Sequence, residues 1–199
     1  REFGNVIIAQ EHRPQQAAQK VAYLPQTRSV PNITARRMVL HGRFPYLSYP
    51  RRYRQEDLRM AEAAMAQMGV SELENRSLTT LSGGQRQKVY IAMALAQDTP
   101  VLLMDEPNTF LDIAHQLQLM ELCRDLARQG RAVVVVLHDL NLALQYADRI
   151  ALFGEGTLLA QGTGSDLCAG GWLDRAFGVT VTPWQTPQGT RYAFRLPSE

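Results

Sequence analysis

The stretch that decides the fold runs from residue 81 to residue 112 and reads LSGGQRQKVYIAMALAQDTPVLLMDEPNTFLD. Its Ser-Gly-Gly opening leads into an amphipathic run that predicts a helix over 85–97. Glycine lets a backbone approach a ligand closely, and the N–H groups of a first helical turn favour an anion. After the helix, the apolar run 101–104 predicts a strand that ends in the adjacent carboxylates of Asp105 and Glu106.

The two adjacent carboxylates indicate metal and phosphate chemistry at a sheet edge. A buried parallel strand delivers its C-terminal residues to the edge where ligands of open α/β folds bind. One carboxylate can bind a metal ion while its neighbour acts on water. Strands and helices alternate on either side of this stretch, so we expect an α/β fold with a mostly parallel sheet flanked by helices.

Composition limits the classes of protein that fit. The 199 residues suit one ordinary domain, and 45% hydrophobic with 20% charged residues is typical of a soluble globular protein. A net charge of +2 is too small to argue for nucleic acid or an acidic membrane. Cys123 and Cys168 lack metal-ligand spacing, so we expect reduced cysteines and a cytosolic setting. No apolar run approaches the roughly 20 residues of a membrane span.

The motifs together resemble the nucleotide-binding subunit of an ATP-binding-cassette (ABC) transporter. Residues 81–85 resemble the signature loop of that family, residues 101–106 its Walker B strand and residues 108–112 its D-loop. Gln26, in the sequence Tyr-Leu-Pro-Gln, resembles the Q-loop glutamine, and His138 resembles the switch histidine. The resemblance implies a P-loop NTPase-like fold with a helical signature subdomain.

Spacing decides how Gln26 and His138 are interpreted. Any strand can end in a glutamine, and a lone histidine is usually a structural residue, so neither residue is informative by itself. Gln26 precedes Ser82 by 56 residues, and His138 follows Glu106 by 32 residues. Both spacings are similar to those of the ABC family, which favours the functional interpretation.

The resemblance implies ATP and Mg²⁺ as ligands and gives four residues a role in hydrolysis. Asp105 would bind Mg²⁺ directly or through water, and Gln26 would complete the shell of the metal and of the attacking water. Glu106 would act as the general base that polarises this water. His138 would hold the γ-phosphate by donating a hydrogen bond from its ring.

A second group of residues would bind the nucleotide of a partner subunit. In ABC dimers each ATP lies between the phosphate loop of one subunit and the signature loop of the other. The resemblance therefore implies a head-to-tail homodimer in which Ser82, Gly83, Gly84 and Gln85 face the partner's nucleotide. Asp112 would organise the opposite site across the interface, and its alternative role is to cap the following helix.

Three segments resemble ATPases of iron-siderophore, haem and cobalamin importers: residues 42–46 (GRFPY), 111–116 (LDIAHQ) and 138–141 (HDLN). That resemblance implies a peripheral protein at the cytoplasmic face of the bacterial inner membrane, with a substrate-binding protein as an indirect partner. Permease subunits would dock near Arg43–Tyr49. The basic and aromatic run 42–53 has two alternatives, a single-stranded nucleic-acid surface and a plain structural loop. We expect no nucleic-acid partner.

Two other functions compete with transport. ATPases of the chromosome-organising or DNA-repair kind share these motifs, but they carry coiled coils or zinc modules between Q-loop and signature. The interval from Gln26 to Ser82 has no room for a coiled coil and contains no cysteine. A nonenzymatic assembly module is the second competitor, and the intact Gln26, Glu106 and His138 argue against it.

The sequence contains no Gly-x-x-x-x-Gly-Lys-Ser/Thr, the phosphate-binding Walker A loop that usually accompanies a Walker B strand. Because the chain begins at Arg1 and the loop lies upstream in ABC proteins, we expect a fragment that by itself binds ATP poorly and hydrolyses none. We expect residues 1–162 to be an ABC ATPase domain without its N-terminal part, with a helical subdomain at about 34–97, and residues 163–199 to be a C-terminal extension.

The predicted elements follow from periodicity, caps and turn residues. Helices are expected over 15–20, 34–41, 56–68, 113–129 and 140–147. Strands are expected over 4–10, 21–24, 149–153 and 157–161, with a further hairpin within 179–196. The four valines within 132–137 predict a strand buried on both faces.

Overall fold

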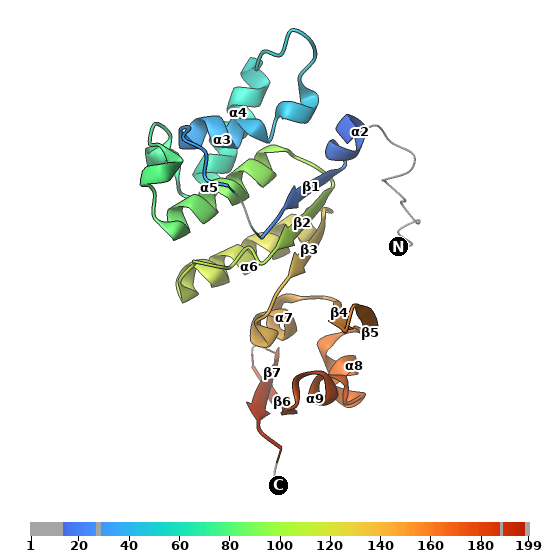
Figure 1. The fold of residues 1–199 in the computed structure, drawn as a ribbon. Helices are drawn as coiled ribbons and strands as arrows, with labels where there is room; N and C mark the ends of the chain where they lie inside the picture. The colour runs from blue at the N-terminus through green and yellow to red at the C-terminus, as the bar shows by residue number, and fades with distance from the viewer. Residues whose placement is uncertain (1–13, 27–28, 188, 198–199) are drawn as a thin grey trace. The chain divides into compact units, whose positions relative to one another are not determined.

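The computed structural model describes residues 14–26, 29–187 and 189–197, and it divides the chain into two compact units, Arg1–Val136 and Leu137–Glu199 (Figure 1). The strand predicted over residues 4–10 lies outside the described residues. The functional boundary that we expect after residue 162 differs from this division and stays a prediction.

The first unit combines a parallel sheet with helices. Its main elements are α2 (Pro14–Ala18), β1 (Val21–Leu24), α3 (Ala35–His41), α4 (Gln55–Gln67), α5 (Gly83–Ala96), β2 (Val101–Asp105), α6 (Ile113–Arg128) and β3 (Ala132–Val136). Short 3₁₀ helices occupy Phe44–Tyr46, Ser71–Leu73 and Leu78–Thr80. The elements predicted over these residues are confirmed. The largest shifts of an end are two residues, at the end of α2 and at the start of α5, which Ser82 caps.

The sheet of the first unit has the order β1-β2-β3, and both pairs are parallel. Leu24 pairs with Met104, and Asp105 pairs with Val136, so the carboxyl ends of the three strands share one edge. Alternate residues of β1 and β2 (Ala22, Leu24, Leu102 and Met104) are buried, and they form the covered face of the sheet. This alternation is the period-two pattern of strands.

The other face of the sheet is open. Tyr23, Val134 and Val136 are 53%, 50% and 46% exposed. The prediction that the strand within 132–137 is buried on both faces is therefore wrong for the part of the chain that the structure describes. A run of valines shows that a strand can bury both faces, but it carries no information about which segments cover them.

The region between β1 and β2 is helical. Thr34 caps α3 by accepting a hydrogen bond from the Arg37 backbone N–H. Helices α3, α4 and α5 pack on one another and bury Val39, Ala61 and Ile91, among others. Gly42 follows α3 where the backbone of α5 is very close, since a Cβ at this position would lie 2.1 Å from the Met93 carbonyl oxygen. Only glycine permits that approach.

The second unit is a small α+β assembly. Its elements are α7 (Leu140–Tyr146), β4 (Ile150–Gly154), β5 (Thr157–Gly162), α8 (Gly164–Ala169), α9 (Trp172–Phe177), β6 (Thr180–Thr186) and β7 (Gly189–Arg195). The β4–β5 and β6–β7 pairs are antiparallel, which confirms both predicted hairpins. Leu144, Leu167, Leu173 and Val181 form its core. Helices α8 and α9 were not predicted.

None of the helices within the described ranges combines the length and the apolar character that crossing a membrane requires.

Candidate functional site

The carboxyl edge of the sheet brings Gln26 and Asp105 to the same side of the first unit. Asp105 is the last residue of β2 and is partly buried, and Gln26 follows β1 by two residues and is exposed. Because Leu24 and Met104 are paired in a parallel register, both residues lie at one edge of the sheet. A carboxylate and an amide oxygen are hard donors of the kind that Mg²⁺ prefers, so the donor set fits that ion.

Glu106 has an unusual backbone conformation. Its φ of 47° is left-handed, which costs a non-glycine residue about 1–2 kcal/mol. Its N–H donates to the Val136 carbonyl oxygen at 3.1 Å, so the main chain stays attached to β3 while it turns out of the strand. Strained backbone of this kind clusters at functional sites, which supports a catalytic role for the carboxylate.

Gln87 fixes the turn that follows Glu106. Its side-chain amide donates to the Pro107 carbonyl oxygen at 2.6 Å, and the residue is only 5% exposed. This bond ties α5 to the segment after β2. Gln87 is not among the site residues predicted from the sequence. The available signal was its position one turn before Ile91, on a helix face that is otherwise apolar and buried.

The signature loop begins α5 with a capping box. The Gln85 backbone N–H donates to Ser82 Oγ at 3.2 Å, and the Ser82 N–H donates to Gln85 Oε1 at 3.1 Å. A Cβ on Gly84 would lie 3.1 Å from the Phe110 carbonyl oxygen, which is tighter than ordinary contact. Gly83 and Gly84 therefore place the first turn of α5 against the backbone of the segment 108–112.

Asp112 caps α6. The His115 backbone N–H donates to Asp112 Oδ1 at 2.9 Å, and His115 Nδ1 lies 2.7 Å from the same oxygen. These two bonds hold the pKa of Asp112 below its ordinary value, and the bond from the His115 backbone has the larger effect. The structure thus supports the alternative role as a helix cap, and the role across a subunit interface stays a prediction.

His138 follows β3 by two residues and is exposed at the start of the second unit. Its predicted contact with a γ-phosphate stays a prediction. The other sequence-predicted residues fall into two groups. Gln26, Asp105 and Glu106 lie at the carboxyl edge of the sheet. Residues 82–85 lie beside residues 108–112.

No cluster of three or more His, Cys, Asp or Glu side chains suited to a metal ion occurs within residues 14–26, 29–187 and 189–197. A magnesium ion in a nucleotide site typically uses one or two carboxylates together with phosphate oxygens and water. Asp105 with a nucleotide would meet that requirement.

The predicted docking segment Arg43–Tyr49 contains one residue that cannot dock. Arg43 is 6% exposed, and its Nε donates to Asp57 Oδ1 at 3.0 Å. Its Nη1 donates to the Ala96 carbonyl oxygen at 3.0 Å, and its guanidinium lies 4.1 Å from the centre of the Tyr46 ring. The expectation that Arg43 is a surface residue is corrected, because α5 and the start of α4 enclose its charge. Tyr49, by contrast, is 97% exposed.

Comparison with known proteins places these features in one family. A family model described as ABC transporter matches residues 3–109. The chain is 44% identical to the achromobactin transport ATP-binding protein CbrD of Dickeya dadantii, over 89% of this chain and 66% of that protein. It is 39% identical to the ferric enterobactin transport ATP-binding protein FepC of Escherichia coli, over 85% of this chain and 64% of that protein.

Solved structures agree with the fold. An ABC transporter assigned to the metal-chelate type, in an inward-facing conformation, matches with a TM-score of 0.78 and 27% identity, over 88% of this chain and 72% of that chain. A bacterial ABC transporter cassette solved as a dimer matches with a TM-score of 0.66 and 27% identity, over 75% of this chain and 65% of that chain. The chain spans slightly less than two thirds of the two curated relatives, at 66% and 64% of their lengths.

Proposed function

This chain belongs to the ABC transporter ATP-binding family, and we propose that it is part of the ATP-hydrolysing subunit of an importer for an iron-siderophore, haem or cobalamin-type substrate. The observation that carries the proposal is the carboxyl edge, where Asp105 ends β2 and Glu106 turns out of the strand with a left-handed φ. Two similar proteins are named as ATP-binding proteins of achromobactin transport and of ferric enterobactin transport. These names support an iron-siderophore type of substrate.

The residues at the sheet edge suggest how hydrolysis proceeds. Asp105 would hold Mg²⁺ directly or through water, and the Gln26 amide oxygen would complete the shell of metal and water. Mg²⁺, when bound, neutralises charge on the phosphate oxygens. Glu106 accepts a hydrogen bond from the attacking water and withdraws its proton. His138 donates a hydrogen bond to the γ-phosphate.

We also propose a head-to-tail homodimer, with the first turn of α5 facing the partner's ATP. The N–H groups of Gly83 and Gly84 lie in a first helical turn, where an α-helix offers no internal acceptor and favours an anion. The resemblance to a cassette that was solved as a dimer supports this arrangement. Asp112 would then contribute across the interface while it caps α6.

The proposed setting is the cytoplasmic face of the bacterial inner membrane, where the subunit is peripheral and binds the membrane-spanning permease subunits. Residues 44–49 remain the proposed docking segment, without the buried Arg43. A substrate-binding protein acts only indirectly, through the permease. We propose no nucleic-acid partner.

The test is ATP hydrolysis by the full-length protein that contains this chain. Glu106→Gln removes the base and keeps the shape, so kcat should fall at least about 100-fold while ATP binding persists. Glu121→Gln is the matched control, because Glu121 is exposed on α6 and should leave kcat unchanged. Wild-type protein that hydrolyses no ATP would overturn the proposed function, and normal turnover by Glu106→Gln would remove Glu106 from the mechanism.

A further inference from the structure

We propose that residues 49–54 form a basic surface that receives an acidic segment of the membrane-spanning partner. This inference rests on the proposed function and specifies the chemistry of the docking contact. Residues 42–54 contain four arginines and no aspartate or glutamate. The basic residues Arg51, Arg52 and Arg54 of the 49–54 surface are all exposed.

The charge of the 49–54 surface is not neutralised from within the unit. Asp57 is the nearest buried carboxylate, and both of its oxygens are already engaged. Asp57 Oδ1 accepts from Arg43 at 3.0 Å, and Oδ2 accepts from the Arg54 backbone N–H at 2.9 Å. Among the residues that the structure describes, Arg51 and Arg52 form no ion pair. The surface therefore presents positive charge that an acidic partner can compensate.

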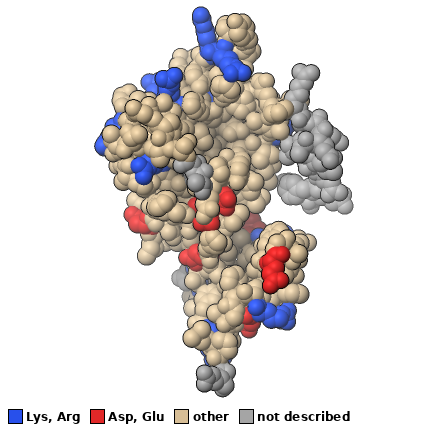
Figure 2. Space-filling model, viewed as in Figure 1, with Lys and Arg blue, Asp and Glu red and all other residues tan. Residues whose placement is uncertain are grey.

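Figure 2 is consistent with this distribution, because Lys and Arg side chains, and no Asp or Glu, are visible at the upper end of the first unit. Figure 1 draws the segment between α3 and α4 at that end. A field of one sign speeds association with a partner of the opposite sign and disfavours partners of like charge.

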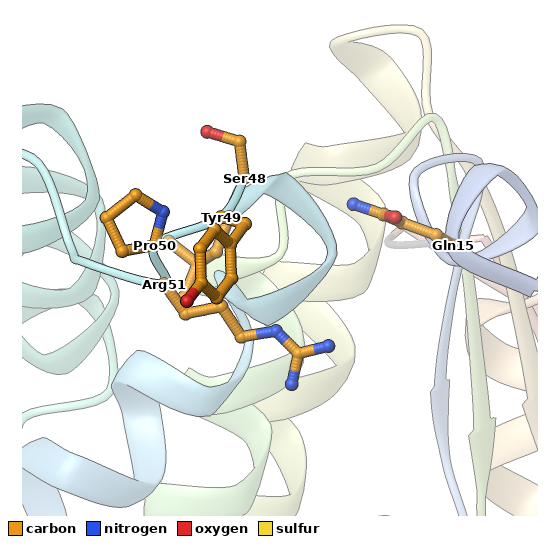
Figure 3. Close-up of a pocket in the computed structure, with 6 residues that line it drawn as sticks. Gln15, Ser48, Tyr49, Pro50 and Arg51 are labelled. Carbon is orange, nitrogen blue, oxygen red and sulfur yellow. The ribbon is translucent and has the colours of Figure 1, made fainter.

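A cavity of about 580 Å³ opens beside these arginines. Figure 3 shows Gln15 on one side of it and Tyr49, Pro50 and Arg51 on the other. Leu47 and Ser48 complete the lining. Tyr49 is 97% exposed at the rim. Tyrosine and arginine are enriched in protein interfaces, and the guanidinium fork binds a carboxylate through two parallel hydrogen bonds.

The walls of the cavity are held in place before any partner binds. The side-chain amides of Gln15 and Gln19 both donate to the Pro45 carbonyl oxygen, at 2.9 Å and 2.8 Å. The Arg51 guanidinium lies 4.6 Å from the centre of the Phe44 ring. Because these groups are already ordered, binding loses less conformational entropy. A concave site that combines an arginine with apolar residues suits an acidic peptide segment better than it suits a planar layer of lipid headgroups.

The experiment uses the full-length subunit and the permease subunits of its own transporter, reconstituted in nanodiscs of neutral phosphatidylcholine. Arg51→Glu/Arg52→Glu reverses two charges of the surface. Arg124→Glu/Arg128→Glu is the matched control, which reverses one half-buried and one exposed charge on α6. We expect the first variant to weaken permease binding at least 10-fold and the control to leave it within about twofold. Basal ATP hydrolysis by the isolated subunit should stay unchanged in both variants.

Two further readouts fix the nature of the partner. In the first, photoreactive p-benzoylphenylalanine replaces Tyr49. We expect it to cross-link to a cytoplasmic permease segment, and we expect that segment to contain Asp or Glu. A cross-linked segment without acidic residues would contradict the proposal. Vesicles of phosphatidylglycerol and phosphatidylcholine test the lipid alternative. If Arg51→Glu/Arg52→Glu abolishes vesicle binding but leaves permease affinity intact, the surface binds lipid and the proposal is overturned.

The outcomes separate this inference from the proposed function. Wild-type protein that hydrolyses ATP and binds the permease, with unchanged affinity in Arg51→Glu/Arg52→Glu, overturns only the acidic contact. Wild-type protein that neither hydrolyses ATP nor binds the permease overturns the proposed function and the acidic contact together.

Discussion

At the scale of single residues, a buried ion pair lies beneath the docking segment. The side chains of Arg43 and Asp57 are each 7% exposed, and together they join the end of α3, the start of α4 and the last turn of α5. A buried pair of this kind is costly to desolvate but more costly to break, because its loss leaves one charge uncompensated in the interior.

Arg43→Met should therefore lower the free energy of unfolding by about 3–5 kcal/mol, measured by urea denaturation. Arg36→Met is the control, since its ion pairs with Glu62 and Glu74 are exposed and should contribute less than about 1 kcal/mol. Arg43→Met/Asp57→Leu removes both charges and should recover part of the loss. An equal loss in the single and double variants would show that packing and the bond from the Arg54 N–H to Asp57, and not charge, are responsible.

Asp112 gives a pH-dependent prediction. Hydrogen bonds from His115 lower the pKa of Asp112 below its ordinary value of 3.8, so its charged form stabilises the fold. That contribution is present above the ordinary value and is lost as the pH falls through the lowered pKa. Asp112→Asn keeps a capping side chain but has no charge to lose. Its melting temperature should lie below that of wild type at pH 6 and converge with it near pH 2. A constant gap over this range would contradict the pKa shift.

At the scale of elements, α5 connects the signature loop to the Walker B strand. Its first turn lies against residues 108–112, Gln87 holds Pro107, and Arg43 binds the carbonyl of its last residue, Ala96. A displacement of α5 would therefore reach the backbone that presents Glu106. Gln87 is a positioning residue in this arrangement, because its amide donates to the Pro107 carbonyl oxygen, one residue after the catalytic position.

Gln87→Leu removes the hydrogen bond to Pro107 and retains most of the side-chain volume. In the full-length protein we expect kcat to fall about 10-fold with an unchanged KM for ATP, because a misplaced general base affects the chemical step and not nucleotide binding. Gln87→Glu, which has an oxygen in place of the amide donor, should also be impaired. Thr34→Ala, which removes the cap of α3, is the control for stability. If Thr34→Ala lowers kcat and the melting temperature as much as Gln87→Leu does, the effect of Gln87→Leu is general destabilisation.

At the scale of the whole molecule, one face of the parallel sheet is apolar and open among the residues that the structure describes. The relatives are about half as long again as the segment matched here, since the chain spans 66% and 64% of two of them. Tyr23, Val134 and Val136 form an apolar face of the kind that helices cover on both sides of a parallel sheet. An apolar face of this kind is suited to packing against further secondary structure.

The 199-residue chain by itself should show no ATP hydrolysis, because its sequence lacks the Gly-x-x-x-x-Gly-Lys-Ser/Thr motif that contacts the β- and γ-phosphates. The measurement is phosphate release with Mg²⁺ and ATP, compared with the full-length protein under the same conditions. Turnover by the 199-residue chain that Glu106→Gln abolishes would contradict this expectation.

The sequence by itself determined the main elements and the order of the motifs. Helix caps, strand alternation and turn residues act between positions a few residues apart, so the helices and the two hairpins could be predicted locally. The predicted chemistry of Asp105 and Glu106 also came from the sequence, because the two carboxylates stand next to each other at the end of one predicted strand.

The tertiary structure decided which side chains are buried and what they bind. Gln87 meets Pro107 across 20 positions, and Arg43 meets Ala96 across 53. No local pattern predicts such contacts, because they depend on how α3, α4 and α5 pack. For the same reason the sequence placed Arg43 on the surface and β3 inside the core, whereas the fold encloses the arginine and leaves one face of the strand open. Burial is set by neighbours distant in the chain, and only the folded structure brings them together.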